Sequence, residues 1–344
     1  MAQLDRDVLR TPLCERLGID VPIVQAPIGR VSCPALAAAV TNAGGLGMLG
    51  LSYREPKLIL EDVEEIRALT SDGPFGVNLI LAWDQRERLA ACLDAGARIV
   101  SLHWSDPAEI ETYVEQAHAA GALVLHTIGN SSEARHALDF GVDVIVAQGL
   151  DAGGHVWGSI GTLSLVPAVV DAVSPTPVVA AGGIGDGRGV AAVLALGAQA
   201  AWMGTRFVVA EESLSHPEYR ARIVAANETD AVWSAGVFDL GFPAPVRTLD
   251  NSTLRAWRQA GSPPNGERPG EGDVVVRGSD DEPIMRYDFA PPVEGMRGDI
   301  EAMANHAGQS VGVVKKVQPA QEIVREVADE ARAILTGWQD GASS

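Results

Sequence analysis

A histidine at the end of a glycine-rich segment is the residue best suited to acid–base chemistry in this sequence. The segment reads QGLDAGGH and runs from Gln148 to His155, directly after an apolar run. Glycines allow a loop to lie close over a flat ligand. An imidazole with an ordinary pKa of about 6.5 is mostly neutral at pH 7 and can accept a proton. A loop histidine that only caps a carbonyl group is the competing interpretation, and both stay open at this point.

Two turns of small residues farther along the chain are candidates for a phosphate site. Ala181-Gly182-Gly183 follows one apolar run, and Gly204-Thr205 follows the next. Small residues let backbone N–H groups approach phosphate oxygens, so no cluster of lysine and arginine is required. The glycines could instead serve only to make tight turns. Two such turns after consecutive runs favour the phosphate site.

Other polar side chains also follow apolar runs. The amides of Asn78 and Gln148 could bond the edge of a heteroaromatic ring as both donor and acceptor. Capping of a loop is the alternative for these amides. His103 and His126 end two further runs, and we expect them to line the site without taking part in the chemistry. The spacing of carboxylates, histidines and cysteines suits neither Mg²⁺ nor zinc, so we expect no metal.

Eight short apolar runs must position these residues, and we expect each run to form a strand. They are rich in Val, Ile, Leu and Ala without polar alternation, as strands buried on both faces should be. The runs are Ile23–Ala26, Leu46–Leu49, Phe75–Leu79, Ile99–His103, Leu123–His126, Val144–Ala147, Val178–Ala181 and Ala200–Met203. Between them lie stretches that begin with helix-starting residues such as Pro or Ser and end near Gly. The expected helices are Pro34–Ala43, Pro56–Leu69, Gln85–Ala95, Pro107–Ala120, Ser131–Phe140 and Gly187–Leu196.

The regular alternation of strands and helices predicts an α/β fold, specifically a (β/α)8 TIM barrel. A doubly wound sheet fits less well, because the first run continues as QAPIGRV and lacks the GxGxxG pattern. Reactive groups of such barrels lie on the loops that follow the strands. The candidate residues would therefore meet at one mouth of the barrel.

The alternation stops near residue 226, which predicts three parts. Residues 1–226 would form the barrel, and residues 227–300 a smaller, partly helical insertion that covers its mouth. Residues 301–344 would return to the barrel with a helix over Pro319–Trp338. Within the insertion, Gly261–Pro283 is rich in Pro, Gly and charge and predicts a mobile surface loop. Three aromatic residues of the insertion could line a pocket or only pack against one another: Trp233, Trp257 and Tyr287.

Composition and charge exclude several other classes of protein. The chain has 344 residues, of which 47% are hydrophobic, and its net charge is 26 − 45 = −19. Such a surface repels nucleic acids and anionic lipids, so we expect neither as a partner. The cysteines Cys14, Cys33 and Cys92 show no disulfide or zinc spacing. With no apolar run of about 18 residues and no secretory signal, we expect a cytoplasmic protein that could form homo-oligomers.

Several segments together are similar to one flavin-dependent family. They read VPIVQAPIGRVSCPALAAAVTNAGGLGMLG, FGVNLI, GVDVIVAQGLDAGGHVWG, PVVAAGGIGDGRGVAAVLALGAQAAWMGTRFV and HAGQSVG. They resemble the nitronate monooxygenases, formerly called 2-nitropropane dioxygenases, over about residues 12–210 and 300–325. The resemblance implies a barrel with non-covalently bound FMN and no metal.

The resemblance also implies a role for individual residues. His155 matches the catalytic base of the family. The residues that would contact FMN are Ala26, Pro27 and Ile28 along the isoalloxazine, Asn78 and Gln148 at polar atoms, Gly153, Ala181, Gly182, Gly183, Gly204 and Thr205 at the ribityl chain and phosphate, and Gln309 and Ser310 from the C-terminal segment. The family often carries Tyr before AGQ, where this chain has His306, a second histidine that could face the flavin. The bulky Trp157, two residues after His155, could shape the pocket.

The chemistry that the resemblance implies is the oxidation of alkyl nitronates by O₂ to a carbonyl compound and nitrite. A neutral nitroalkane would first lose its α-proton to His155. The main alternative is a reductase of the same superfamily that uses NAD(P)H to reduce a quinone or an enoyl thioester. A flavin-free, phosphate-binding barrel is a third alternative.

Overall fold

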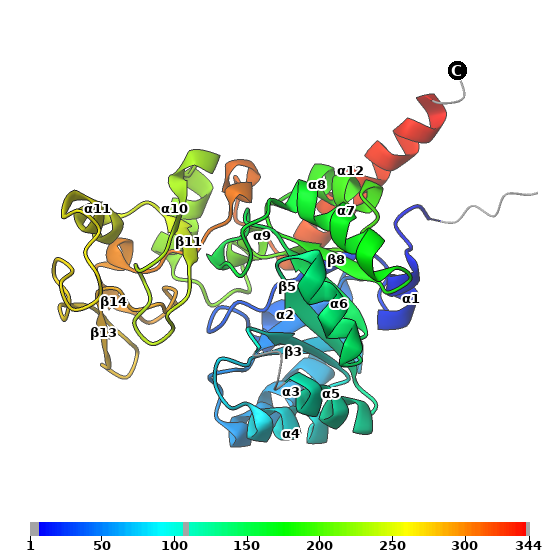
Figure 1. Cartoon of the computed structure of the whole chain (residues 1–344), viewed down its shortest axis with the longest axis horizontal. Helices are drawn as coiled ribbons and strands as arrows, with labels where there is room; N and C mark the ends of the chain where they lie inside the picture. Colours follow the sequence, from blue (N-terminus) through cyan, green and yellow to red (C-terminus); the bar gives the residue numbers. More distant parts are fainter. Residues whose placement is uncertain (1–6, 106–109, 342–344) are drawn as a thin grey trace, which may run out of the picture.

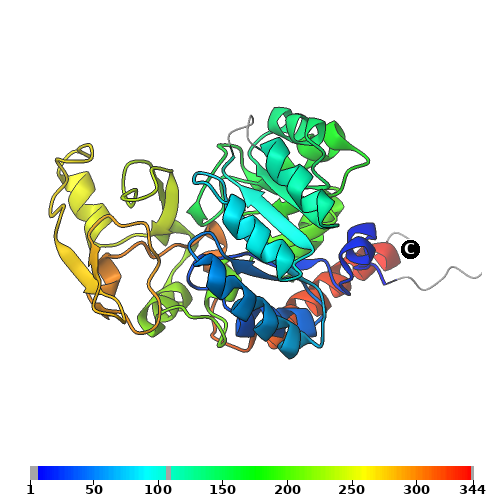
Figure 2. The ribbon, with the colours of Figure 1, turned by 90° about the horizontal axis from the view of Figure 1, so that it is seen from below.

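The structure, a computed structural model, describes residues 7–105 and 110–341. Its largest sheet has eight parallel strands in the order β1-β9-β8-β6-β5-β4-β3-β2. A parallel bridge between Val24 and Leu46 joins its two edges, so the sheet closes into a barrel (Figure 2). The strands are β1 (Ile23–Gln25), β2 (Gly47–Gly50), β3 (Phe75–Ile80), β4 (Ile99–His103), β5 (Leu123–Ile128), β6 (Val144–Gln148), β8 (Val178–Ala181) and β9 (Ala200–Met203). The predicted TIM barrel is confirmed.

Helices cover the outside of the barrel. They are α2 (Pro34–Asn42), α3 (Pro56–Thr70), α4 (Arg86–Asp94), α5 (Ile110–Ala119), α6 (Ser131–Asp139), α7 (Thr162–Val173) and α8 (Gly187–Ala195). The beginning predicted for α5, at Pro107, lies outside the described residues. Helix α7 was not predicted, because it holds Pro167 and its almost uniformly apolar sequence shows no polar face. A short helix, α1 (Pro12–Leu17), packs Leu13 and Leu17 against residues of the barrel interior.

The strands are buried on both faces, which explains why their sequences lack polar alternation. One set of side chains, including Val24, Met48 and Val146, fills the barrel interior. The alternate set, including Val77 and Val100, packs beneath the surrounding helices. The barrel is thus a packed core whose loops are free to carry the chemistry.

The segment after the barrel strands contains more strand than the sequence predicts. It begins with α9 (Thr205–Val208) and α10 (Pro217–Ala225), and continues with β10 (Ala231–Ser234), β11 (Val246–Leu249), α11 (Ser252–Gln259), β12 (Val274–Arg277), β13 (Pro283–Met285) and β14 (Arg297–Gly298). The predicted loop over Gly261–Pro283 is wrong for Val274–Arg277, which forms the middle strand of a small sheet. The β-branched run Val274–Val276 favours a strand despite the Pro and Gly before it. The boundaries at residues 226 and 300 stay a prediction.

A second small sheet links this insertion to the barrel. It has the order β10-β11-β7, and β7 (Gly154–His155) belongs to the loop after β6. Figure 1 shows the insertion on one side of the barrel and the long helix α12 (Ala320–Gly341) on the other. Residues of α12 such as Ile323 and Val327 share a buried cluster with α2 and α8.

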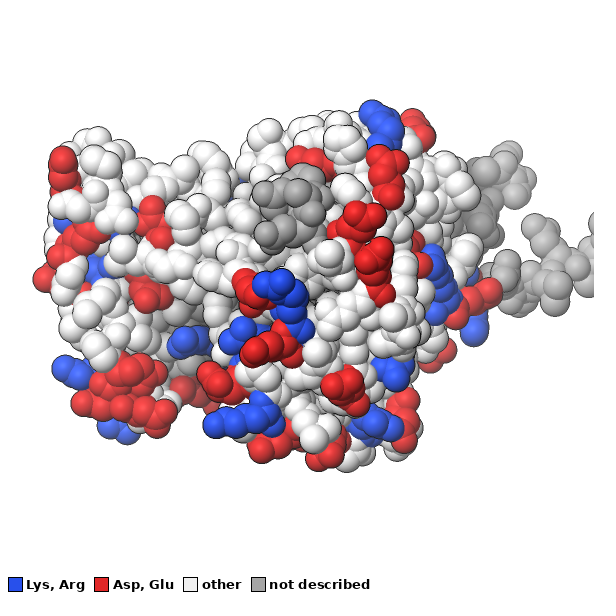
Figure 3. Space-filling model, turned by 60° about the horizontal axis from the view of Figure 1, so that its bottom comes forward, with Lys and Arg blue, Asp and Glu red and all other residues white. Residues whose placement is uncertain are grey.

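The surface carries the acidic excess of the sequence. On the face shown in Figure 3, acidic side chains are spread over the barrel and the insertion, and basic ones lie among them. In the described part of the chain, no helix has the length and apolar character needed to cross a membrane.

Candidate active site

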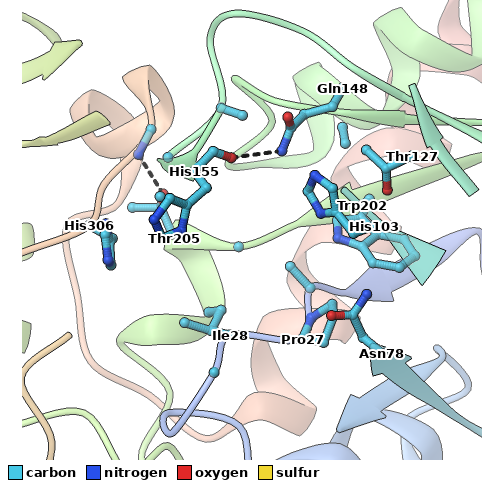
Figure 4. A pocket seen from close by; sticks show the side chains of 18 of the residues that line it. Pro27, Ile28, Asn78, His103, Thr127, Gln148, His155, Trp202, Thr205 and His306 are labelled. Atoms are coloured by element: carbon cyan, nitrogen blue, oxygen red, sulfur yellow. Dashed lines mark hydrogen bonds between the residues drawn. The ribbon is translucent and has the colours of Figure 1, made fainter. Parts of the chain in front are cut away.

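A cavity opens at the carboxyl ends of the barrel strands, between the strand-following loops and the insertion. It contains about 1310 Å³ of empty space, including the part open to solvent. The predicted site residues that line it are Ala26, Pro27, Ile28, Asn78, His103, Gln148, Gly153, His155, Ala181, Gly182, Gly183, Gly204, Thr205, His306 and Ser310 (Figure 4).

Three predicted site residues do not line this cavity. Strand β5 runs two residues farther than predicted, and successive side chains of a strand alternate between its faces. Thr127 therefore lines the cavity, while His126 bonds the Leu102 carbonyl through Nδ1. The side chain of Gln309 is exposed. Trp157 donates its indole N–H to Glu133 at 2.7 Å.

The glycines of the site allow close contact between separate segments. A Cβ atom on Gly153 would lie 2.3 Å from the backbone nitrogen of Gly308, so only glycine fits there. Gly308 in turn donates its N–H to the hydroxyl of Thr205 at 2.9 Å. Gly182 and Gly183 have φ angles of +102° and +72°, which favour glycine. These contacts fasten the loop after β6 to the C-terminal segment and to the start of α9.

The two predicted amides differ in how much of their bonding capacity is free. The side-chain amide of Gln148 donates to the backbone carbonyl of His155 at 3.2 Å and accepts from the backbone N–H of Trp157 at 2.8 Å. Its side chain therefore positions its own loop, and its predicted bond to flavin stays a prediction. Asn78 donates to Ser101. Among the described residues, the side-chain oxygen Oδ1 of Asn78 has no partner and is available as an acceptor.

His155 is held in place by the insertion. Its strand β7 pairs antiparallel with β11, with His155 opposite Val246 and Gly154 opposite Arg247. The guanidinium of Arg247 donates to the carbonyls of Leu150 and Ala152 in the His155 loop. The sequence did not single out Arg247, because its partners are backbone carbonyls about a hundred positions away.

The imidazole of His155 is half-buried, and its Nε2 is shielded from solvent. Burial lowers its pKa well below 6.5, and the neighbouring His306 and His103 lower it further. Burial also lowers the pKa of His103 to about 3 and that of His306 to about 4. Nε2 of His155 has no hydrogen-bond partner among the described residues. The cavity thus holds three neutral imidazoles, and each has one ring nitrogen without a hydrogen-bond partner among the described residues.

The apolar wall of the cavity comes from aromatic residues that the sequence did not indicate. Phe242 lies over His155, with ring centres 4.4 Å apart, and Phe289 lies 5.8 Å from the same imidazole. Tyr53 and Trp104 extend this wall from the loops after β2 and β4. All four lie singly in irregular segments, so no periodic pattern marks them.

Two of the three aromatic residues that the sequence did indicate, Trp257 and Tyr287, pack within the insertion, and none of the three lines the cavity. The side chain of Trp233 is 44% exposed on β10. Trp257 donates its indole N–H to the Pro263 carbonyl, and the Tyr287 hydroxyl donates to the Pro269 carbonyl. Among the described residues, no group of three or more His, Cys, Asp or Glu side chains could hold a metal ion.

The fold places this protein among the TIM barrels, with a cavity at the carboxyl ends of the strands. The sequence profile of the nitronate monooxygenases matches residues 10–87 and 81–330. A nitronate monooxygenase of Pseudomonas aeruginosa is 32% identical, over 92% of this chain and 97% of that protein. The chain belongs to the nitronate monooxygenase family and is an oxidoreductase. Its family is flavin-dependent.

Further relatives show how varied this fold is in activity. FabK from Thermotoga maritima superposes with a TM-score of 0.78 at 30% identity, over 96% of this chain and 99% of that chain. A nitroalkane oxidase from Streptomyces ansochromogenes superposes with a TM-score of 0.73 at 28% identity, over 93% and 98%. A 5-hydroxy-7a-methyl-1-oxo-octahydro-1H-indene-4-carboxyl-CoA dehydrogenase from Mycobacterium tuberculosis is 38% identical, over 63% of this chain and 61% of that protein.

Proposed function

We propose that this chain oxidises alkyl nitronates with O₂ to a carbonyl compound and nitrite, using FMN, and that it also accepts nitroalkanes. The observation that carries the proposal is the position of His155 in the cavity wall, with an Nε2 that is shielded from solvent and has no hydrogen-bond partner among the described residues. Membership of the nitronate monooxygenase family supports it.

The residues of the cavity suit FMN in both polarity and space. The N–H groups of Gly183 and Ile184 form no hydrogen bond with another described residue, so both could donate to a phosphate. Beside them, a Cβ on Gly204 would have only the Cβ of Ala26 nearby, at 3.6 Å, which leaves the cavity open. The free side-chain oxygen Oδ1 of Asn78 would accept a hydrogen bond from an N–H group of the flavin ring. When bound, FMN would supply the redox chemistry, taking electrons from the substrate and passing them to O₂.

The role of His155 is to remove a proton from the neutral substrate. The Cα–H bond of the nitroalkane breaks, the proton moves to a His155 imidazole nitrogen, and the electron pair enters the nitro group to give the nitronate. A positioned base contributes about 10²–10⁴-fold to such a step. A nitronate supplied as such needs no base. The apolar rings of Phe242 and Phe289 limit the access of water to the imidazole.

The test compares electron donors on the purified protein. We expect it to carry the visible absorbance band of oxidised flavin, and an alkyl nitronate to bleach this band without oxygen while NADH does not. Rapid bleaching by NADH alone would establish the reductase alternative instead. A protein that binds no flavin on reconstitution with FMN would be a flavin-free barrel. The cofactor released by acid should run as FMN on chromatography, and FAD there would overturn the assignment of FMN.

A further inference from the structure

His155, the proposed general base, lacks the partner that usually orients a catalytic histidine. General bases are commonly held by a second group that bonds the other ring nitrogen. No Asp or Glu lines the cavity in the described part of the chain. The titratable side chains around His155 are His103 from β4, His306, Tyr53 and, at the mouth, Arg30. The guanidinium of Arg247, on the paired strand, is bound to carbonyls.

The protonation state of His306 follows from its contacts. Its Nε2 lies 2.9 Å from the carbonyl oxygen of Phe289. A carbonyl can only accept, so Nε2 carries the proton and Nδ1 has a free lone pair. That Nδ1 is buried and has no hydrogen-bond partner among the described residues. The hydroxyl of Tyr219 donates to the His306 carbonyl, which fixes the backbone at this position.

His306 and His155 are close enough for a direct hydrogen bond after a small rotation. Their ring centres lie 5.6 Å apart and the ring planes are tilted by 48°. Two imidazoles at this separation can turn facing nitrogens to about 3 Å, which is hydrogen-bond distance. Figure 4 shows both rings together, with His103 across the cavity from His306. His306 is therefore better placed than His103 to receive a proton of His155.

We propose that His306 is a positioning residue for the base, and that its Nδ1 accepts a hydrogen bond from His155 once His155 is protonated. This inference rests on the proposed function. When the α-proton reaches one nitrogen of His155, both nitrogens carry N–H groups, and one of them points to His306 Nδ1. A hydrogen bond that favours the charged form raises the basicity of a buried group. A neutral His306 thus offsets part of the burial that weakens His155, whereas a protonated His306 would lower the pKa of His155 further.

The experiment uses two variants that distinguish the role of Nδ1 of His306 from that of Nε2. In His306→Gln the amide reaches the position of Nε2 and keeps the bond to Phe289, but no acceptor remains at Nδ1. In His306→Asn the amide oxygen takes the position of Nδ1. The steady-state kcat/KM of the holoenzyme is measured against pH for a neutral nitroalkane and for its preformed nitronate. His136→Gln, an exposed histidine on α6, is the matched control.

We expect His306→Gln to lower kcat/KM for the nitroalkane by about 10-fold or more, which is the scale of a hydrogen bond to a charged group. The ascending limb of its pH profile should move to lower pH by about one unit. Its rate on the nitronate should change by less than about 2-fold. His306→Asn should retain most of the nitroalkane activity and place the limb near that of the wild type.

Equal losses on both substrates, or an Asn variant no better than the Gln variant, would overturn the inference. Histidine NMR titration supplies a readout that needs no turnover, because loss of the bond should lower the pKa of His155 in the Gln variant only. This separates the two proposals. A protein inactive on nitronates would refute the proposed function, whereas unchanged His155 titration in His306→Gln would refute the hydrogen bond.

Discussion

Replacement of Arg247 by methionine tests whether the insertion holds the catalytic loop. Arg247 lies on β11 and is 5% exposed. Its three nitrogens donate to the carbonyls of Ala152, Ala231 and Leu150 at 3.2, 3.0 and 2.9 Å. Two of these carbonyls belong to the loop that ends in His155. Methionine keeps the apolar stem of the side chain and removes every donor.

The expected loss in the free energy of unfolding follows from these three hydrogen bonds. A buried carbonyl left without a donor costs about 1–3 kcal/mol, so three of them could lose about 3 kcal/mol even at the lower end. The guanidinium is itself buried, which lowers its pKa, so its removal recovers some of this cost. We therefore expect Arg247→Met to lower the free energy of unfolding by about 2–3 kcal/mol.

Urea denaturation followed by circular dichroism measures this change, with flavin retention recorded on the same samples. Arg297→Met is the matched control, because Arg297 is an exposed arginine on β14 and its loss should change stability by less than about 0.5 kcal/mol. Arg247→Met should also reduce activity on the nitroalkane, since the His155 loop loses two of its anchors. A midpoint equal to that of the control would show that water satisfies the three carbonyls, and the reasoning would fail.

Three further predictions concern the site and its buried histidines. His155→Asn should lower activity on a neutral nitroalkane by about 10²-fold or more, lower activity on the preformed nitronate far less, and keep its flavin. Equal losses of activity on the two substrates would mean that His155 only positions a ligand. Gly183→Asp should lose bound flavin on desalting, because a carboxylate would face the phosphate and the φ of +72° strains any side chain; full retention would place the phosphate elsewhere. His103 and His126 have pKa values lowered to about 3 and about 4 from 6.5, so the unfolded chain binds more protons below pH 6.5. The free energy of unfolding should therefore fall, by about 1.4 kcal/mol per pH unit for each histidine between about pH 6 and pH 4, and a flat urea midpoint from pH 6.5 to 5 would contradict this.

The barrel could be predicted because its cause is visible in short stretches of sequence. A strand such as Ile99–His103, buried on both faces, must be apolar at every position, and Gly96 and Gly121 mark the ends of the helices on either side. The errors fall where two signals compete. Pro167 lies inside α7, and Val274–Arg277 forms a strand in a region whose Pro and Gly content indicates a loop.

The site could be predicted only as far as it depends on strand ends. The glycine turns and His155 follow strands and reach the cavity, whereas His126 does not, because β5 continues past it and turns its side chain away. Phe242 and Phe289 reach the cavity through the fold of the insertion. That placement depends on contacts between distant segments, and no local pattern records them.

The insertion therefore contributes more than a cover. The loops of the barrel supply the small residues and free N–H groups that suit a phosphate, while the insertion supplies the surroundings of the base. Its strand β11 pairs with His155, its Phe242 ring buries the imidazole, and its Phe289 carbonyl fixes the proton of His306. Burial weakens a base, and a free acceptor beside it restores part of that strength. Changes in this segment should thus alter proton abstraction and substrate choice while leaving intact the turns after β8 and β9 that suit a phosphate, and that separation allows one barrel to support different reactions.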